Sequence, residues 1–184
     1  MDSLHTPAAQ RGLTLIESAI TLAITAILVC SAAPDVSAML ERHRLAGAAA
    51  QLASDVQWLR SEAVLRKETL RLSFFDSTAG SCYVLHSGAR NQCQCDGRSA
   101  SAVCTADAVA FKTVTLGASA RIGVQSNVSS MVFDPLHGTA TPAGTLKVSA
   151  ASGRAIHHVV NVLGRVRTCT PASPGPAVAG YPTC

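Results

Sequence analysis

The sequence has 184 residues, which suits one folded domain with an additional segment. Its net charge of +4 is too small to indicate a partner by itself, and only 14% of the residues are charged. The mean hydropathy is +0.28, and much of the apolar content lies in one block near the N-terminus. The composition therefore predicts a membrane segment in front of a less apolar domain.

The first segment, residues 1–12, is polar and ends in Arg11-Gly12, and an apolar run follows over residues 13–33. A run of about 20 residues is long enough to cross a bilayer as a helix. Its hydroxyl groups can bond to the helix backbone, which makes them tolerable in lipid; they belong to Thr14, Ser18, Thr21 and Thr25.

An acidic residue, Glu17, interrupts this apolar run. An ionised carboxylate in lipid costs several kcal/mol unless it is paired, so such residues are usually functional. The alternative is an ordinary signal peptide, with Ser31-Ala32-Ala33 as its cleavage site. The position of Glu17 argues against that alternative.

The N-terminal motif Gly12-Leu13-Thr14-Leu15-Ile16-Glu17 resembles the cleavage site of type IV prepilins and pseudopilins. The resemblance implies that a prepilin peptidase cuts after Gly12, on the cytoplasmic side of the inner membrane. Leu13 would then become the first residue of the mature chain, usually N-methylated. Glu17 would pair with the terminal amine of a neighbouring pilin subunit and so guide assembly of the filament.

The helical pattern continues from residue 35 to residue 68 as an amphipathic helix. Pro34 stands where pilin helices carry a kink, because proline removes one helix hydrogen bond. Apolar residues recur at helical spacing at Leu45, Leu52, Val56, Leu59 and Ala63. This stripe is predicted to pack on the chain's own sheet, with Arg42, Arg44, Arg60 and Arg66 available to solvent.

The last segment, residues 69–184, is predicted to be a β-rich head. Alternating apolar patterns separated by turn residues predict strands at 70–74, 82–86, 109–115, 120–125, 131–133, 145–149, 155–161 and 165–168. A long helix followed by antiparallel strands indicates an α+β fold. The predicted organisation is a leader (1–12), a transmembrane and assembly helix (13–34), an amphipathic helix (35–68) and this head.

Six cysteines of the head form an even set that predicts disulfides in an exported domain: Cys82, Cys93, Cys95, Cys104, Cys169 and Cys184. Their pairing stays open, with Cys169–Cys184 preferred because it closes the Pro/Gly-rich tail. The alternative for the cysteines between residues 82 and 104 is a zinc site, but Cys-x-Cys lacks the usual zinc-ligand spacing. Cys30 lies in the apolar run and is interpreted as a small hydrophobic residue.

No pattern in the chain predicts catalysis, a metal or a cofactor. Motifs for a nucleophilic serine, a zinc protease and a phosphate-binding loop are absent from the sequence. His157 and His158 are adjacent in a predicted strand, so their rings point to opposite faces and cannot share one metal. We interpret both as partly exposed strand residues.

The C-terminal part contains three notable segments, residues 132–138, residues 142–145 and the element Gly164-Arg165-Val166-Arg167. Together they resemble the C-terminal signature of the FimT/GspH branch of minor pilins and minor pseudopilins. In FimT-type minor pilins a Gly-Arg-x-Arg element is associated with DNA binding during natural transformation. Two residues apart in a strand, Arg165 and Arg167 project from the same side and match phosphate oxygens.

The charge distribution agrees with an anionic partner. From residue 111 onward Asp134 is the only acidic residue, and the basic residues are Lys112, Arg121, Lys147, Arg154, Arg165 and Arg167. Arg154 and Lys147 are predicted to widen a double-stranded-DNA site around Arg165. The alternative is a purely architectural role, in which the arginines pair with carboxylates of the head or of a neighbouring subunit.

The sequence therefore predicts a minor type IV pilin, held in the inner membrane by one helix before it joins a pilus. Its partners would be other pilins, the prepilin peptidase and DNA. The alternative is a minor pseudopilin of the type II secretion system, because the same leader serves both machineries.

Overall fold

The computed structural model describes residues 14–95, 99, 101–173 and 175–184, and for residues 31–35 it describes the backbone but not the side chains. The chain forms two compact units, Met1–Leu40 and Glu41–Cys184. Helix α1 (Leu15–Arg66) contributes residues to both units.

In the first unit, the hydroxyls of the apolar run bond to the helix backbone as predicted. Ser18 Oγ donates to the Leu15 carbonyl (2.8 Å), and Thr21 and Thr25 make the same kind of bond (2.9 and 2.7 Å). Thr14 differs, because its Oγ1 accepts a hydrogen bond from the Glu17 amide (3.3 Å) and so caps the start of the helix.

Three predictions for the N-terminal region fall partly or wholly outside the described residues. The predicted leader (1–12) and the predicted cleavage and methylation sites, Gly12 and Leu13, lie outside the described residues, and so does the side chain of Pro34 at the predicted kink. Within the described part of the chain, no helix combines the length and the apolar composition needed to cross a membrane. The membrane span predicted for residues 13–34 stays a prediction.

The second unit, Glu41–Cys184, contains the predicted β-rich segment 69–184 together with the amphipathic part of α1, and it is called the head from here on. The predicted stripe Leu45, Leu52, Val56, Leu59 and Ala63 is fully buried, and Ala49 extends it. Burial of these side chains holds the helix on the sheets, because each buried leucine or valine contributes about 1.5–3 kcal/mol to the stability of the fold. The helix ends where Lys67 adopts a left-handed conformation (φ 55°) and Glu68 N bonds to the Ala63 carbonyl (3.2 Å).

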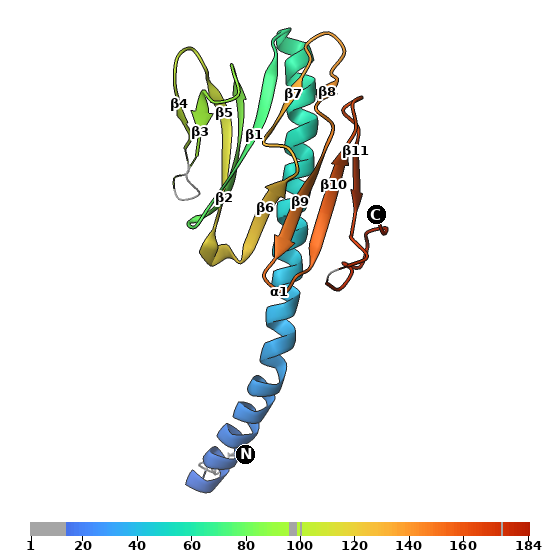
Figure 1. Ribbon diagram of the computed structural model, residues 1–184. Coiled ribbons are helices and arrows are strands. Elements are labelled where there is room, and N and C mark those ends of the chain that lie inside the picture. The colour runs from blue at the N-terminus through green and yellow to red at the C-terminus, as the bar shows by residue number, and fades with distance from the viewer. Residues whose placement is uncertain (1–13, 96–98, 100, 174) are drawn as a thin grey trace, which may run out of the picture. The chain divides into compact units, whose positions relative to one another are not determined.

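The strands of the head form three antiparallel sheets (Figure 1). The first has the order β5-β2-β1-β7-β8, the second β11-β10-β9-β6, and a small third sheet pairs β3 with β4. The elements are β1 (Leu70–Ser77), β2 (Gly80–Ser87), β3 (Cys93–Gln94), β4 (Val103–Cys104), β5 (Ala110–Gly117), the 3-10 helix η1 (Ala118–Ala120), β6 (Ile122–Ser126), β7 (Ser130–Phe133), β8 (Ala140–Thr141), β9 (Gly144–Ala150), β10 (Ala155–Val160) and β11 (Val166–Cys169).

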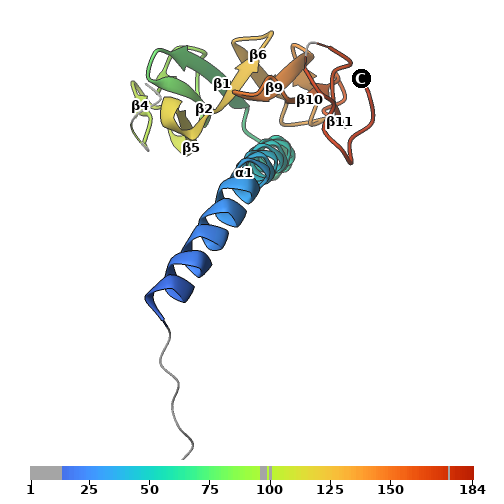
Figure 2. The same cartoon turned by 90° about the horizontal axis from the view of Figure 1, so that it is seen from below.

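Both large sheets lie on the same side of the helical part of the head (Figure 2). The core sits between that helix and the sheets, and strands of both sheets contribute to it, for example Leu72, Leu85, Leu146 and Ile156. The chain leaves the first sheet through η1, enters the second as β6 and returns as β7. A bond from Val124 N to Ser81 Oγ (2.8 Å) ties β6 to the first sheet. The predicted α+β fold class is confirmed.

Each of the eight strands predicted from the sequence has a counterpart within one or two residues at most ends. The short strands β3, β4 and β8 were not predicted, because two residues carry no usable alternation. α1 is one helix from Leu15 to Arg66, so the predicted boundary at residue 34 separates two predicted roles within that helix.

Three disulfides connect the six cysteines of the head: Cys82–Cys95, Cys93–Cys104 and Cys169–Cys184. The preferred pair Cys169–Cys184 is therefore present, with a Cα–Cα distance of 4.9 Å. The other two bridges use the sulfurs that the zinc alternative required, so that alternative is wrong. Both bridges fasten the β3–β4 ribbon, and Cys82 ties it to β2.

Candidate functional site

The sequence placed the candidate site on the hairpin that joins β10 to β11. Asn161 closes this turn in three ways: its amide donates to the Arg165 carbonyl (3.1 Å), its Oδ1 accepts from Arg165 N (2.9 Å), and its carbonyl accepts from Gly164 N (2.9 Å). Hydrogen bonds from both the backbone and the side chain of Asn161 therefore hold the turn. Arg165 and Arg167 follow it with exposed side chains.

Gly164 is required at this turn for two independent reasons. Its φ of +71° lies in the left-handed region that side chains disfavour. A Cβ at this position would also lie 2.7 Å from the Gly138 carbonyl oxygen and 2.9 Å from Cδ of Arg60. The glycine thus allows the hairpin to approach the helix closely, which the sequence did not reveal.

Arg60 holds the two loops against the helix. Its Nε donates to the Gly138 carbonyl (2.9 Å), and Gly138, like Gly164, packs directly against its side chain. We expected Arg60 to face solvent, but it is partly buried and positions the hairpin that carries Arg165. A second tie between the loops is the bond from Ala140 N to the Val162 carbonyl (2.8 Å).

Asp134 organises the loop before Gly138 by hydrogen bonds. Its Oδ1 accepts hydrogen bonds from the amides of His137 (2.8 Å) and Leu136 (3.0 Å). These bonds, led by that of the His137 amide, hold the pKa of the Asp134 carboxyl below its usual value. Asp134 is consequently engaged in its own loop.

Lys147 lies on the same face of the second sheet as Arg167. Register pairs place Arg167 opposite Val159, and Cys169 and Lys147 on either side of His157. Paired residues of antiparallel strands point to the same face, and these positions alternate with buried ones such as Leu146 and Val148. Arg165, Arg167 and Lys147 are called the basic face below.

Neither Arg165 nor Arg167 forms an ion pair within the described part of the chain. Arg154 does not share this freedom, because its Nη1 lies 3.7 Å from Oε1 of Glu41 and its side chain is only 18% exposed. Arg154 is therefore a paired cation in this structure, and its predicted part in a DNA-binding site stays a prediction. The Glu41 that neutralises it lies 113 positions earlier, on helix α1.

Lys112 is also neutralised by the helix. Its Nζ lies 2.6 Å from Oδ1 of Asp55, which is buried, and Oδ2 of the same carboxylate accepts from the Tyr83 hydroxyl (2.8 Å). Burial, together with this carboxylate, raises the pKa of Tyr83. Sequence reasoning missed Asp55, although an acidic residue beside the buried helix stripe was a usable signal.

The two adjacent histidines do point to opposite faces, but only one of them is partly exposed. His157 is half-buried beside Lys147, and both its burial and that ammonium group lower its pKa. His158 is 1% exposed, so the prediction of an exposed ring was wrong for it. Its Nδ1 bonds to Thr168 Oγ1 (2.9 Å), and burial lowers its pKa although the Ala49 backbone opposes the shift.

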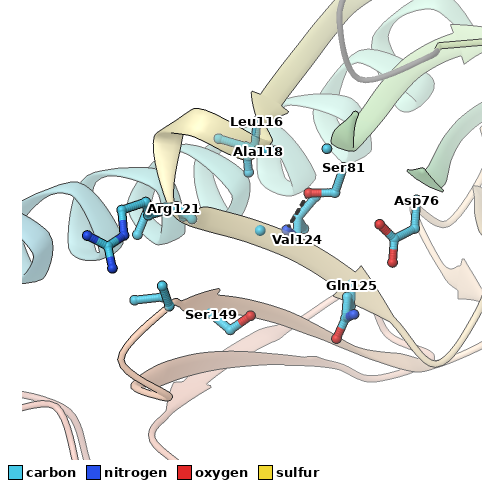
Figure 3. A pocket seen from close by; sticks show the side chains of 13 residues that line it. Asp76, Ser81, Leu116, Ala118, Arg121, Val124, Gln125 and Ser149 are labelled. Carbon is cyan, nitrogen blue, oxygen red and sulfur yellow. Dashed lines mark hydrogen bonds between the residues drawn. The ribbon is translucent and has the colours of Figure 1, made fainter. Parts of the chain in front are cut away.

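A cavity of about 290 Å³ lies at the junction of the two sheets (Figure 3). Its polar side chains come from different elements, and Figure 3 shows Arg121 and Asp76 at opposite ends, with Val124 between them. The Ser81 hydroxyl in this cavity accepts the hydrogen bond from the Val124 amide (2.8 Å), so it helps to join the two sheets.

In the first unit, the side chain of Glu17 is exposed in the first turn of α1. Its amide donates to Thr14 Oγ1, so the Thr-x-x-Glu pattern here matches the first half of a capping box. This cap uses the backbone amide of Glu17 and was not predicted, and the assembly role of the Glu17 carboxylate stays a prediction.

Comparison with known proteins identifies the family. The family model described as "Type II transport protein GspH" matches residues 48–164, more than half of the chain. The chain belongs to the GspH family. The match begins within the amphipathic helix and ends at Gly164, so it includes neither Glu17 nor Arg165 and Arg167. No curated protein sequence matched the chain.

Two solved structures resemble this GspH-family chain, both of the type IV minor pilin FimU from Pseudomonas aeruginosa (strain PAO1). The crystal structure in space group P21 is 19% identical, covers 74% of this chain and 95% of that chain, and has a TM-score of 0.51. The crystal form in P65 is 16% identical, covers 71% and 95%, and has a TM-score of 0.47. At 19% identity the likeness shows the fold alone.

Family and fold together make this protein a pilin-like subunit of the GspH/FimT branch, and so a minor pilin or pseudopilin. Membership implies association with other pilin-like subunits. The family and the fold are those of structural components rather than enzymes.

Proposed function

We propose that this GspH-family protein is a minor type IV pilin whose head binds double-stranded DNA through its basic face. The observation that carries the proposal is that Arg165 and Arg167 are exposed without an ion pair in the described chain, on a hairpin fixed by Asn161, Gly164 and Arg60. A fixed hairpin reduces the entropy lost when guanidinium groups engage phosphates. Contacts of this type provide affinity without sequence preference.

The assembly part of the proposal concerns the N-terminus. A prepilin peptidase cleaves after Gly12, the inner membrane holds residues 13–34, and the Glu17 carboxylate pairs with the Leu13 amine of a neighbouring subunit. The exposed position of Glu17 in the first turn of α1 leaves its carboxylate available to another chain. Opposite charges brought together in lipid relieve the cost of burying either one alone.

The DNA test uses the full chain in detergent micelles and a fluorescently labelled duplex, with anisotropy measured at several salt concentrations. Binding should weaken as salt rises, and Arg165→Gln or Arg167→Gln should each reduce the salt slope by about one. Arg42→Gln, which removes an exposed charge from helix α1, is the matched control. Binding that is absent, or that the control variant weakens equally, would reject the DNA proposal and leave the family assignment intact.

The assembly test compares Glu17→Ala with Glu17→Gln. Both variants should insert and be cleaved, and both should enter filaments poorly, because each lacks the charge. Glutamine keeps the length and polarity of the side chain, so it separates loss of the charge from loss of the side chain. Normal incorporation of Glu17→Gln, measured by immunoblotting of sheared pili, would show that the charge is not needed.

The alternative function is a minor pseudopilin of type II secretion, and the specific observation in its favour is the description of the matching family model. A deletion strain separates the two functions. Loss of pili and of DNA uptake supports the pilin, whereas accumulation of normally secreted proteins in the periplasm supports the pseudopilin.

A further inference from the structure

The outer edge of the second sheet carries a second feature, which concerns backbone groups rather than the arginine side chains. Strand β11 is the last strand of that sheet and pairs on one side with β10 (Figure 1). Because Asn161 N donates to the Arg165 carbonyl, residues 161 and 165 form a hydrogen-bonded pair. In an antiparallel ladder such pairs alternate with pairs that are not bonded to each other.

The register then decides which groups point outward. Val166 and Thr168 stand opposite Val160 and His158, in the positions that are not bonded across the pair. Their N–H and C=O groups therefore point away from β10, toward the open edge. Such groups are a template for another strand.

The C-terminal tail shows that this edge accepts a strand. Thr170, the next outward-pointing residue, donates its N–H to the Pro182 carbonyl (2.8 Å) and accepts from Cys184 N (2.9 Å). The Cys169–Cys184 disulfide fastens the tail at that point. Of the described residues on this edge, Thr170 is paired by the tail, while Val166 and Thr168 are left open.

The side chains of β11 specify what an added strand must carry. On the outer face it would lie beside Arg165 and Arg167, at the spacing of neighbouring strands, about 4.8 Å. On the inner face it would lie beside the half-buried Val166 and Thr168. A second copy of residues 165–168 does not fit, because it would bring arginines of the two chains together, and like charges at this spacing are destabilising.

We infer that the open edge of β11 binds an extended segment of a partner protein in which acidic and β-branched apolar residues alternate. Backbone hydrogen bonds to Val166 and Thr168 hold the segment, and its acidic residues pair with Arg165 and Arg167. This is strand addition to an existing sheet, in which side chains supply the selectivity. The inference goes beyond DNA binding and does not require it.

The test uses the full chain in detergent micelles and a blocked hexapeptide, Glu-Val-Glu-Val-Glu-Val. Binding should slow hydrogen exchange at the amides of Val166 and Thr168, as followed by NMR. The same peptide with lysine in place of glutamate should not bind. Unchanged exchange at these two amides at saturating peptide would overturn the inference.

Two variants separate the backbone from the charge. Val166→Pro removes one outward N–H, and proline is tolerated where an edge N–H faces solvent. It should weaken the peptide about fivefold, because one hydrogen bond is worth about 1 kcal/mol, and it should leave duplex DNA affinity unchanged. Arg167→Gln should weaken both ligands, whereas Arg121→Gln, an exposed arginine on another part of the head, should weaken neither.

A control in the peptide guards against misfolding of the proline variant. Methylating the peptide's backbone nitrogens that face β11 should abolish binding to the unaltered protein. Equal affinity of the methylated peptide would overturn strand addition. Failure of duplex DNA to bind, with peptide binding retained, would reject the DNA proposal alone.

Discussion

The two large sheets of the head differ in the surroundings of their basic side chains. On the first sheet, Lys112 is neutralised by the buried carboxylate of Asp55, which also holds Tyr83, and two disulfides fasten the adjoining ribbon. On the second sheet, Arg165 and Arg167 are exposed, and the outward backbone groups of Val166 and Thr168 are open. Lys112 of the first sheet therefore stabilises the fold, whereas Arg165 and Arg167 of the second sheet remain available to partners.

The largest effect should come from the charge cluster of the first sheet. Asp55→Ala leaves the Tyr83 hydroxyl without its acceptor in a buried site and removes the partner of Lys112. We expect a loss of about 3 kcal/mol in the free energy of unfolding, measured by urea denaturation. Asp55→Asn keeps an acceptor for Tyr83 and should cost less. If alanine costs no more than asparagine, the cluster is not a structural anchor.

The next effect concerns the hairpin of the second sheet. Gly164→Ala adds a Cβ that clashes with the Gly138 carbonyl and with Arg60, in a backbone conformation that already disfavours alanine. We expect a loss of about 2 kcal/mol in the free energy of unfolding. Gly153→Ala is the control, because Gly153 also has a positive φ (85°) but nothing lies within 4 Å of its Cβ position, so about 1 kcal/mol should be lost. Equal losses would show that contact with Arg60 is unimportant.

Acid should destabilise the head through one buried histidine on each sheet. His86 bonds to Ser73 and Ser87, and burial lowers its pKa, against the effect of the Ser87 backbone. His158 behaves alike. Because the folded-state pKa values are lowered, the unfolded chain binds more protons, so stability is full above about pH 6.5 and falls as pH decreases below it.

The measurement is urea denaturation between pH 7.5 and pH 5. Each histidine should contribute at most about 1.4 kcal/mol per pH unit. His158→Gln should flatten the acid side of the profile if the second sheet contributes. A profile that is unchanged in both His158→Gln and His86→Gln would contradict the assignment.

The smallest effect tests the outer face of the second sheet. Lys147→Gln should leave stability almost unchanged, because the lysine is half-exposed and forms no ion pair in the described chain. It should raise the pKa of His157 toward its ordinary value, since that ammonium group is one cause of the lowering. The histidine titration followed by NMR measures this shift. An unaltered pKa of His157 would show that the Lys147 ammonium group does not lie near His157 on the basic face.

Much of the fold was predictable because its signals are local. The buried stripe at Leu45, Leu52 and Val56 follows from helical spacing, and the strand at residues 145–149 follows from alternation. The tail disulfide followed from the position of its two cysteines around a Pro/Gly-rich loop. The two-residue strands β3 and β8 were missed because their pairing depends on neighbours brought in by the rest of the fold.

The site was predictable only in part, because free and engaged charges look alike in a sequence. Arg165 and Arg154 both read as available cations, yet Arg154 meets Glu41 on the helix. Arg60 read as a solvent-facing residue, yet it bonds to Gly138 at a separation of 78 residues. Long-range partners of this kind become visible only when the helix is packed on the sheets.

The sequence by itself determined the family resemblance, the α+β class and the positions of the long elements, since periodicity and short motifs are properties of neighbouring residues. The tertiary structure decided which charges are free, which histidine is buried and which backbone edge is open. Those properties depend on distances between residues far apart in the chain, and a residue's own surroundings set its charge state and its availability to a partner.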